Sequence, residues 1–263
     1  MAKAGRLQIR NVSKTYEVEG RERLEVLAHV DFEVEPGAFV SLVGPSGCGK
    51  STILRLIVGL DEDYQGEILL DGERLSGTSL NRGIVFQDHR LLPWLTLERN
   101  IALALQNAGR GAQDKARSVR EHIELVGLSG FEQAYPHQLS GGMAQRAAIA
   151  RGLASQPGIL LLDEPLGALD ALTRIRLQQE LLRIWRAEAV TMILVTHDVD
   201  EAIYLSDTVL VMNANPGRIV KRVEVGLGAT RDRASAQFAA IKHEVLEAMG
   251  EYGGQHARTP LAV

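Results

Sequence analysis

The sequence is poor in cysteine and in long apolar segments. Cys48 is the single cysteine of the 263 residues, so no disulfide can form within the chain, and we expect a reducing compartment. No apolar run approaches the roughly 20 residues that a helix needs to cross a bilayer. The first residues, Met1 to Arg6, lack the apolar core of a secretion signal. These absences exclude a disulfide-stabilised scaffold and predict a chain without a membrane span of its own.

The sequence also lacks an excess of charge of either sign. Its 29 Lys and Arg residues and 33 Asp and Glu residues give a formal net charge of −4, which provides no electrostatic case for a nucleic-acid partner. A hydrophobic fraction of 45% and a charged fraction of 24% are ordinary for a globular protein. We therefore expect one large or two small globular domains and no binding of nucleic acid.

What the sequence does contain is a glycine-rich octet, Gly44 to Ser51. β-forming residues at 39–43 precede it and a run with helical periodicity at 52–60 follows it, which is the strand–turn–helix context of a phosphate-binding loop. Glycines let successive backbone N–H groups point at phosphate oxygens, and a helix N-terminus adds about half a positive charge. Lys50 is then predicted to reach the β- and γ-phosphates and the Ser51 hydroxyl to bind Mg²⁺. The alternative is a glycine-rich turn that binds nothing.

The residues predicted to surround the nucleotide here form the turn or open the following helix. They are Gly44, Pro45, Ser46, Gly47, Cys48, Gly49, Lys50, Ser51 and Thr52. We interpret Cys48 as a small filler rather than as a catalytic thiol, because a phosphate site works through backbone amides.

The remaining pattern predicts an α/β protein. Alternating runs at 7–12, 24–27 and 30–34 predict an antiparallel β subdomain near the N-terminus. Fully apolar strands at 159–162 and 191–195, with a helix between them, predict a parallel sheet covered on both faces. The predicted fold class is therefore a P-loop NTPase core with an N-terminal antiparallel β subdomain and an inserted helical subdomain.

Helical patterns set the predicted domain boundaries. Residues from about 96 to 151, rich in Ala, Leu, Glu and Arg, predict the helical subdomain within a nucleotide-binding domain of residues 1–230. An amphipathic pattern from about 231 to 249 predicts a helix in a C-terminal tail, 231–263, whose end from residue 250 is expected to be frayed. A buried strand is also expected at 83–87, ending in a polar residue, Gln87.

Two carboxylates, Asp163 and Glu164, follow one of the apolar strands. Ligands bind at the C-terminal ends of strands in such sheets. Asp163 is predicted to hold Mg²⁺ through water, as strand-end aspartates of P-loop enzymes do. Glu164 is predicted to polarise the attacking water, and a positioned general base contributes about 10²–10⁴-fold in rate. The alternative is an acidic junction between strand and loop with no chemical role.

A second anion-binding element lies at Leu139 to Met143, where a Ser-Gly-Gly turn opens a helix and offers a hydroxyl and free backbone amides. With this stretch the chain resembles the ATP-binding cassette, or ABC, ATPases over nearly its whole length. The motifs stand in the family's order: Gly44 to Ser51, Gln87, Leu139 to Met143, Leu160 to Glu164, Ala168 to Asp170 and His197.

The resemblance implies an ATP site that two copies of the chain share. In this family the serine-glycine turn of one subunit completes the ATP site of the other, which implies that Ser140, Gly141 and Gly142 bind the partner's nucleotide. The implied cofactors are ATP and Mg²⁺. The chain has one phosphate-binding loop and one Ser-Gly-Gly turn, so an isologous homodimer would complete two sites.

Further roles follow from the resemblance. Gln87 is implied to sense Mg²⁺ or the attacking water, and His197 to hydrogen-bond the γ-phosphate and hold Glu164 in place. Tyr16 is implied to stack on adenine, and Asp170 to touch the partner subunit. Structural alternatives remain open: a solvated strand end for Gln87, a structural histidine for His197 and a packing aromatic for Tyr16.

One position departs from the family pattern, because Met143 stands where the family usually has glutamine. The preceding Ser140, Gly141 and Gly142 supply the phosphate contacts in the family, so ATP binding is expected to survive while any contact of the amide is lost. The implied catalytic residues are Glu164, His197, Gln87 and Lys50, and the implied metal-binding residues are Ser51, Gln87 and Asp163.

The stretch from Phe86 to Thr96 looks like the ATPase subunits of importers for nitrate, aliphatic sulfonates and taurine. The segment 214–220 is similar to their closing strand pair. Leu92, Pro93 and Trp94 are implied to form part of a groove that receives a helix of the membrane subunit, since an exposed Trp suits a helix-in-groove contact. The alternative is that Trp94 only anchors the helical subdomain, because Trp is usually highly buried.

The function implied by this resemblance is an ATPase of the translocase class that couples ATP binding and hydrolysis to uptake of a small anion, such as an aliphatic sulfonate, nitrate or taurine. Its implied partners are a second copy, transmembrane permease subunits and, indirectly, a periplasmic solute-binding protein. The implied location is the cytoplasmic face of the inner membrane. The alternative is a soluble ABC ATPase of the cluster-assembly type, and the solute itself cannot be inferred from these residues.

Overall fold

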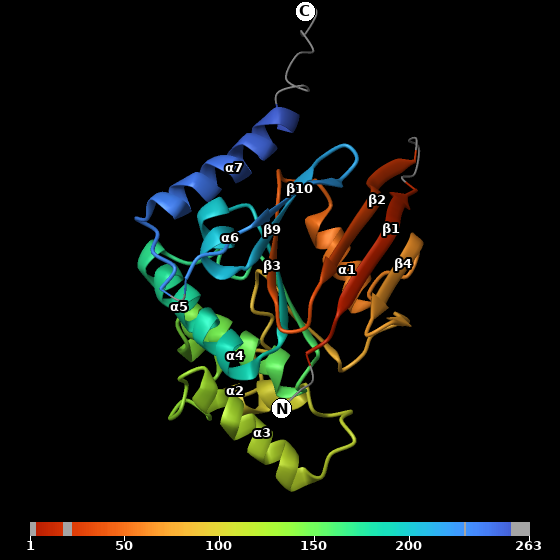
Figure 1. Ribbon diagram of the computed structural model, residues 1–263. Helices are drawn as coiled ribbons and strands as arrows, with labels where there is room; N and C mark the ends of the chain where they lie inside the picture. The colour runs from red at the N-terminus through yellow and green to blue at the C-terminus, as the bar shows by residue number, and fades with distance from the viewer. Residues whose placement is uncertain (1–3, 18–22, 229, 254–263) are drawn as a thin grey trace, which may run out of the picture. The chain divides into compact units, whose positions relative to one another are not determined.

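The computed structural model describes residues 4–17, 23–228 and 230–253. The chain divides into two compact units. We call residues 6–77 and 194–263 the P-loop unit, and residues 1–5 and 78–193 the helical unit. The elements follow one another along the chain as coloured in Figure 1. No helix in the described part of the chain is both long and apolar enough to pass through a bilayer.

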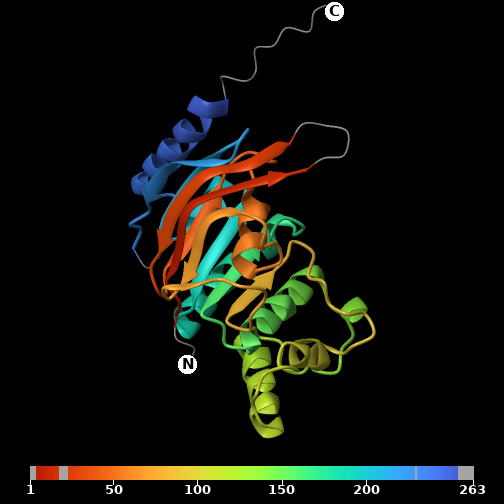
Figure 2. The same ribbon diagram turned by 90° about the vertical axis from the view of Figure 1, so that its right-hand side faces the viewer.

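The P-loop unit begins with an antiparallel sheet, which curves beside the first helix (Figure 2). Its strands β1 (Leu7–Tyr16), β2 (Leu24–Val34), β4 (Gln65–Leu70) and β5 (Glu73–Arg74) are ordered β2-β1-β4-β5. The expected alternation is present, since Leu7 and Ile9 are buried while Arg10 is exposed. The two runs expected at 24–27 and 30–34 are wrong as separate strands, because β2 is continuous through His29, whose positive φ of 50° marks an irregularity in the pairing.

The P-loop unit also contains a mixed set of strands that carries the glycine-rich loop. β3 (Phe39–Val43) runs parallel to β9 (Thr208–Asn213), and β10 (Arg218–Glu224) runs antiparallel to β9. All five residues of β3 are buried, which fits a strand covered on both faces. Helix α1 (Lys50–Val58) starts where the loop after β3 ends. The strand and the helix therefore hold the loop at both ends.

Two further helices cover the β9–β10 pair. α6 (Val199–Leu205) and α7 (Ala236–Gly253) bury Phe238, Ile241 and Val245 against Val209 and Val223. The expected tail helix is thus present and packed, and Figure 1 shows it beside α6. It continues to Gly253, so the frayed end expected from residue 250 is wrong for the first four positions, and residues 254–263 lie outside the described part.

The helical unit holds two parallel strands, β6 (Arg82–Val85) and β7 (Ile159–Asp163). The strand expected at 83–87 ends earlier, at Val85, so Gln87 lies in the following loop rather than at a strand end. Strand β8 (Thr191–Thr196) is divided, with its first three residues in the helical unit and its last three in the P-loop unit.

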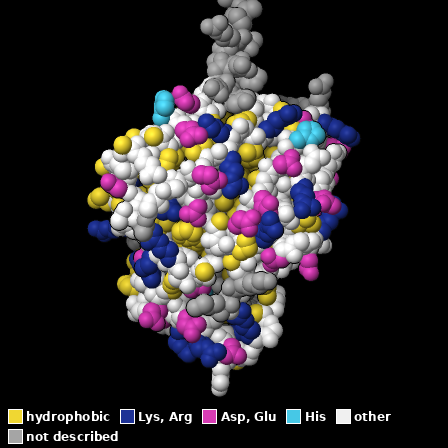
Figure 3. All heavy atoms as spheres, in the orientation of Figure 1, with side chains coloured by type: hydrophobic (Ala, Val, Ile, Leu, Met, Phe, Trp, Pro, Cys, Tyr) yellow, Lys and Arg dark blue, Asp and Glu magenta, His cyan; other side chains and the backbone are white. Residues whose placement is uncertain are grey.

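The segment expected to be helical from about 96 to 151 consists of separate helices. They are α2 (Leu97–Leu103), α3 (Ala112–Leu125), the 3₁₀ turn η1 (Pro136–Gln138) and α4 (Gly141–Ala154), and α5 (Ala171–Glu188) follows β7. Thr96 fixes the start of α2, because its hydroxyl accepts a hydrogen bond from the Arg99 N–H at 3.3 Å. Basic and acidic side chains are interspersed on the face shown in Figure 3.

Candidate nucleotide-binding site

The glycine-rich loop adopts a backbone that requires glycine at two positions. Gly47 has φ of 81° and Gly49, which precedes the first residue of α1, has φ of 94°. These values lie in the left-handed region that residues with a Cβ adopt only at a cost. A Cβ on Gly49 would also collide with the side chain of Leu27 on β2. The tight turn after β3 therefore depends on these glycines, as the sequence predicted for a phosphate-binding loop.

The Lys50 side chain lies inside this loop. Its ammonium group donates hydrogen bonds to the carbonyl oxygens of Gly44 at 2.8 Å and Pro45 at 3.0 Å, and the residue is only 6% exposed. A buried positive charge thus stands at the N-terminus of α1, where the helix dipole adds to it. Together they make an anion-binding centre in the P-loop unit.

Cys48 is a packing residue of the loop. It is 1% exposed, and its sulfur lies 3.8 Å from the Lys50 ammonium. Burial raises the pKa of the thiol, while the neighbouring Lys50 opposes that shift without cancelling it. The neutral thiol is a poor nucleophile, in agreement with the interpretation of Cys48 as a small filler.

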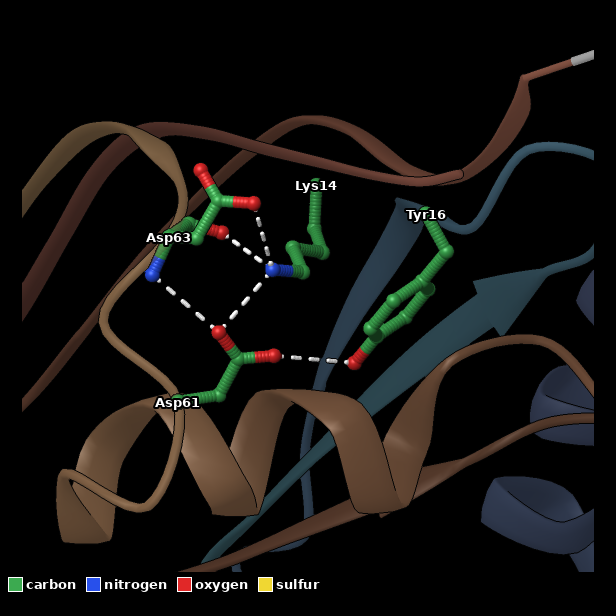
Figure 4. A network of polar contacts seen from close by, with 4 residues as sticks. All are labelled: Lys14, Tyr16, Asp61 and Asp63. Atoms are coloured by element: carbon green, nitrogen blue, oxygen red, sulfur yellow. Dashed lines mark hydrogen bonds and ion pairs between the residues drawn. The ribbon is translucent and has the colours of Figure 1, made fainter. Parts of the chain in front are cut away.

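Tyr16 ends β1 on the side of α1. Its hydroxyl donates a hydrogen bond to Asp61 Oδ2 at 3.1 Å, and the Lys14 ammonium lies 4.7 Å from the ring centroid (Figure 4). Burial raises the pKa of the phenol and Asp61 adds to this, whereas the Thr52 hydroxyl and Lys14 lower it. The contact with Thr52 places Tyr16 at the first turn of the helix that Lys50 begins.

His197 is a further predicted site residue of the P-loop unit. It is exposed and stands between the end of β8 and the start of α6. The turn around it is fixed on both sides: the Asp198 N–H donates to the Thr196 hydroxyl at 3.0 Å, and the Asp198 carboxylate accepts from the Glu201 N–H at 3.0 Å. Asp198 therefore caps α6 and leaves His197 on the outer side of the turn.

In the helical unit, Asp163 is the last residue of β7 and Glu164 follows it. Glu164 has φ of 46°, in the left-handed region. Such a conformation in a residue with a side chain costs about 1–3 kcal/mol and is concentrated at functional sites. A hydrogen bond from the Gly167 N–H to the Glu164 carbonyl at 3.2 Å closes the turn. The strain was not predictable from the acidic pair alone.

Gln87 lies against the loop that follows Glu164. A Cβ built on Gly167 would stand 3.3 Å from Gln87 Nε2. Gln87, Gly141 and Leu169 line one cavity of about 370 Å³. The helical unit therefore brings together three segments that are far apart in the sequence: the loop after β6, the Ser-Gly-Gly turn and the loop before α5.

The Ser-Gly-Gly turn forms the N-terminus of α4. The Ser140 hydroxyl accepts a hydrogen bond from the Met143 N–H at 3.3 Å, and Ser140 and Gly141 are exposed. Gly142 is packed closely, since a Cβ there would stand 2.7 Å from Thr173 Cγ2. Ser140, Met143 and Thr173 line a second cavity of about 280 Å³. The turn is therefore an accessible helix N-terminus of the kind that binds anions.

Asp170 caps the neighbouring helix α5. Its carboxylate accepts a hydrogen bond from the Thr173 N–H at 3.0 Å, and this contact with Thr173 lowers its pKa. Asp170 itself is exposed. The residue expected to touch a partner subunit thus has a structural role within its own chain.

Asn100 is a residue that the sequence did not single out. It is fully buried in α2 and forms four hydrogen bonds with the loop before it. Its Oδ1 accepts from the Leu92 N–H at 2.7 Å, and its Nδ2 donates to the carbonyls of Leu92, Leu95 and Thr96 at 3.2, 3.0 and 3.1 Å. The loop is thereby fixed while Trp94 remains 68% exposed. The exposure of Trp94 contradicts the alternative in which it is a buried anchor.

Two side chains of α4 hold the loop after β6 and were also missed. Gln145 Nε2 donates to the Phe86 carbonyl at 3.2 Å. Arg151 donates to the carbonyls of His89 at 2.8 Å and Arg90 at 2.7 Å. Burial lowers the pKa of Arg151, although it stays charged at neutral pH. In the sequence these two residues appear only as polar residues within a helical pattern, and such a pattern does not identify the groups that they bind.

The donor set predicted for Mg²⁺ suits this ion. Ser51, Asp163 and Gln87 offer oxygen ligands, which Mg²⁺ prefers, and no group of three or more His, Cys, Asp or Glu residues gathers to hold a metal in the described ranges. Mg²⁺ is usually bound by one or two carboxylates together with substrate phosphates rather than by an all-protein cage. The chemistry of these three side chains therefore fits the preference of Mg²⁺ for oxygen ligands.

The comparison with known families agrees with this geometry. A family model described as "ABC transporter" matches residues 27–167. The chain belongs to the ABC transporter family. The matched residues include the phosphate-binding loop, the Ser-Gly-Gly turn and the acidic pair at the end of β7. ATP-binding proteins of this family are ATPases, which supports ATP as the nucleotide and its hydrolysis as the reaction.

Curated relatives and solved structures extend the family assignment over most of the chain. The aliphatic sulfonates import ATP-binding protein SsuB of Bacillus cereus is 52% identical over 88% of this chain and 90% of its own length. A second such protein, from Burkholderia cenocepacia, is 44% identical over 90% and 87%. A dimeric ATP-binding cassette bound to ADP and Pi in a post-hydrolysis state is 31% identical, with a TM-score of 0.72, over 84% of this chain and 100% of that one.

Proposed function

We propose that this chain is the ATP-hydrolysing subunit of an importer for a small organic anion, and that aliphatic sulfonates are the solute class. The observation that carries the nucleotide chemistry is the loop in which Lys50 lies beneath the start of α1. The solute class rests on the relatives at 44–52% identity, whose names refer to aliphatic sulfonates import. Nitrate and taurine are the other anions that the sequence resemblance implied.

The proposed roles of the site residues follow from their chemistry. Lys50 and the backbone N–H groups of the loop bind the phosphates, and Tyr16 stacks on adenine. Glu164 accepts a proton from the attacking water, and His197 hydrogen-bonds the γ-phosphate. Gln87, which lines a cavity beside the loop after Glu164, is proposed to sense Mg²⁺ or the attacking water.

The proposed metal-binding residues are Ser51, Asp163 and Gln87. Mg²⁺, when bound, would neutralise charge on the phosphate oxygens. The chain's own part is to offer the Ser51 hydroxyl at the start of α1 and the Asp163 carboxylate at the end of β7.

We propose a homodimer in which each copy completes the other's site. The support is the accessible N-terminus of α4, where Ser140 and Gly141 are exposed and Gly142 lies next to them. A γ-phosphate that touches both copies would close the dimer, and its hydrolysis would release that contact. We further propose an ABC ATPase domain of residues 1–230, with its helical subdomain at about 96–151, and a C-terminal helical tail, 231–263.

We propose that permease subunits bind at the loop around Trp94. This loop combines an exposed indole with a backbone that Asn100 holds rigid, and rigid aromatic anchors dominate the energetics of protein interfaces. The subunit would then act at the cytoplasmic face of the membrane, with the solute-binding protein reached only through the permease. A soluble ATPase of the cluster-assembly type is the competing function, and it offers no role for this loop.

The reaction and the dimer are tested with Glu164→Gln. This variant should bind ATP but hydrolyse it at least about 10²-fold more slowly, because a general base is lost, and it should elute as a dimer in ATP. Glu124→Gln, the same change at an exposed position of α3, is the matched control and should behave as the parent. Hydrolysis of ATP at the parent rate by Glu164→Gln would show that Glu164 is not the general base.

The importer role is tested by co-expression with permease and solute-binding proteins of an aliphatic sulfonate importer. The subunit should co-purify with the permease, and Trp94→Ala should reduce the amount recovered. In proteoliposomes, ATP hydrolysis should rise with an alkanesulfonate and its binding protein. Stimulation by nitrate or taurine alone would change the solute class, and failure to co-purify with any permease would favour the soluble ATPase.

A further inference from the structure

A buried lysine lies beside the tyrosine that we propose stacks on adenine. Lys14, on β1, is 3% exposed, and its ammonium donates hydrogen bonds to Asp61 Oδ1 at 2.9 Å, to Asp63 Oδ2 at 3.2 Å and to the Asp63 carbonyl oxygen (Figure 4). Lysine is almost never buried without such partners, because a desolvated charge is costly. An apolar side chain at position 14 could not form these hydrogen bonds, so the contacts with Asp61 and Asp63 require a cation there.

Asp61 joins the strand of Tyr16 to the helix of Lys50. It follows the C-terminal end of α1, which Gly59 caps. One carboxylate oxygen accepts from Lys14 and from the Asp63 N–H at 3.1 Å, and the other accepts from the Tyr16 hydroxyl at 3.1 Å. Burial acts to raise the pKa of Asp61, but these hydrogen bonds outweigh it and hold the pKa below its ordinary value. The carboxylate is therefore ionised at neutral pH.

The Tyr16 ring is fixed by two of these contacts. Its hydroxyl is held by Asp61, and the Lys14 ammonium lies over the ring at 4.7 Å from its centroid. A cation in this position is attracted to the aromatic face. The ring also stands beside Thr52 in the first turn of α1. Lys14 thus lies on one face of the ring, and a base that stacks on Tyr16 would use the opposite face.

We propose that Lys14 and Asp61 are positioning residues for the nucleotide base, which hold the Tyr16 ring in the orientation that a purine stacks on. This inference rests on the proposed contact between Tyr16 and adenine. Fixing a binding group in its bound conformation removes the entropy cost of ordering it, so the pair should strengthen binding of the base. Neither residue contacts the phosphate loop in the hydrogen bonds of Figure 4, so binding of phosphates alone should be unaffected.

The experiment compares two probes, ATP and inorganic tripolyphosphate, on the full chain by calorimetric titration. Tripolyphosphate has the phosphates without the base, so it reports the loop alone. Tyr16→Ala should weaken ATP binding by about 10-fold or more, since base–aromatic stacking contributes about 1–3 kcal/mol. Lys14→Met and Asp61→Asn should each weaken it by about 3- to 10-fold, because each removes part of a charge-assisted network. Tripolyphosphate binding should stay at the parent level in all three.

Asp63→Ala is the matched control. It removes a second carboxylate from the same lysine, but the Asp63 side chain is 93% exposed and the backbone carbonyl that Lys14 also contacts remains. Exposed ion pairs contribute little, so its ATP affinity should equal that of the parent. The double variant Lys14→Met, Asp61→Asn should lose about as much ATP affinity as whichever single variant loses more, because the effects of two residues in one network are not additive.

A spectroscopic signal separates positioning from general damage. The pKa of the Tyr16 phenol, followed by NMR with ¹³C-labelled tyrosine, should fall in Asp61→Asn, because the carboxylate raises it together with burial. Asp63→Ala should leave it unchanged. A Tyr16 pKa that is the same in Asp61→Asn and the parent would contradict the contact on which the positioning depends.

The outcomes distinguish this inference from the proposed function. Unchanged ATP affinity in Tyr16→Ala would contradict stacking of adenine on Tyr16, and therefore also the positioning role of Lys14 and Asp61. Weaker ATP binding in Tyr16→Ala with parental affinity in folded Lys14→Met and Asp61→Asn would overturn only the positioning role. Equal weakening of ATP and tripolyphosphate would also overturn it, by showing a general effect on the loop. If Lys14→Met does not fold, Asp61→Asn, which keeps the side-chain shape, decides the question.

Discussion

Two helices of this chain begin on glycine-rich turns, and they begin differently. α1 is preceded by Gly49 at φ of 94° without a side-chain cap, and the cation of its first residue, Lys50, lies inside the loop. α4 is preceded by Ser140, whose own hydroxyl occupies the Met143 N–H, and no basic residue stands in its first turn. The start of α1 therefore combines backbone amides with a cation, whereas the start of α4 offers amides and a hydroxyl without a cation in its first turn.

The two helices are alike in a second respect, because each also fixes a neighbouring segment. α1 is followed by Asp61, which binds Lys14 and Tyr16 of β1. α4 carries Gln145 and Arg151, which bind the carbonyls of residues 86, 89 and 90. In each case the helix is joined by hydrogen bonds to a segment with a proposed role, which is Tyr16 and the base for α1 and the loop that carries Gln87 for α4.

The largest expected effect distinguishes the N-terminus of α1, which carries the cation of Lys50, from the N-terminus of α4, which has no basic residue in its first turn. Lys50→Met should lower the rate of ATP hydrolysis by about 10²–10³-fold, because it removes a preorganised positive charge, and should weaken ATP binding by the single chain. Ser140→Ala should leave single-chain ATP binding unchanged and reduce ATP-dependent dimerisation. Titration calorimetry and size-exclusion chromatography give the two measurements. If both variants lost the same single-chain ATP affinity, the N-termini of α1 and α4 would bind the same ATP within one chain.

The next effect concerns the backbone of the first start. Gly49→Ala should lower the free energy of unfolding by about 3 kcal/mol, because it adds strain at positive φ to a collision with Leu27. Gly47→Ala is the matched control, because its φ is 81° but no atom of a described residue other than its two chain neighbours lies within 4 Å of the position that a Cβ would take there. A loss of about 1 kcal/mol is therefore expected from strain alone. Denaturant unfolding of both variants measures the difference, and equal losses would mean that packing against β2 is unimportant.

The cap of the second start should have a smaller effect on stability. Ser140→Ala removes the acceptor of the Met143 N–H, which costs about 1 kcal/mol in helix N-caps. Ser140→Asp keeps an acceptor at the same place and should restore the free energy of unfolding, although its negative charge should prevent binding of a phosphate. Restored stability together with restored ATP-dependent dimerisation would contradict the role of this turn as an anion site.

The smallest effect is a pH dependence near the end of α1. The folded-state pKa of Asp61 is lowered, so its stabilising contribution is complete above the unfolded pKa of about 3.9 and is lost as the pH falls through the folded value. The parent should exceed Asp61→Asn in unfolding free energy by about 1 kcal/mol from pH 5 to 7. The difference should shrink below about pH 4, and a constant difference down to pH 3 would contradict the lowered pKa.

The order of the motifs and most of the elements could be predicted from the sequence, because they depend on local patterns. The octet from Gly44 to Ser51 predicts its own turn, and the alternation in β1 and the apolar run of β7 predict buried strands. Boundaries were harder to predict where a polar residue interrupts a strand without ending it, as at His29, or follows a strand that has already ended, as at Gln87.

The residues that hold the site in place were not predictable in the same way. Asn100, Arg151 and Lys14 act through partners that lie between 4 and 62 positions away in the chain, and the tertiary structure is needed to identify these partners. The positive φ of Glu164 likewise depends on the turn that Gly167 closes. Sequence patterns predicted the residues proposed to contact the ligand, whereas the residues that orient them could be identified only from the tertiary structure.

The internal hydrogen bonds of Lys50 have a consequence for how a nucleotide is received. The ammonium has three protons, and two of them are directed at the Gly44 and Pro45 carbonyls. The nitrogen also lies 3.8 Å from the Cys48 sulfur, which is a weak acceptor. A phosphate oxygen would replace this weak contact first, whereas further hydrogen bonds to phosphate require the lysine to release its own backbone carbonyls. The loop therefore keeps its shape through self-contacts. In the proposed site a ligand must offer acceptors stronger than backbone carbonyls, and the charged oxygens of a triphosphate are such acceptors.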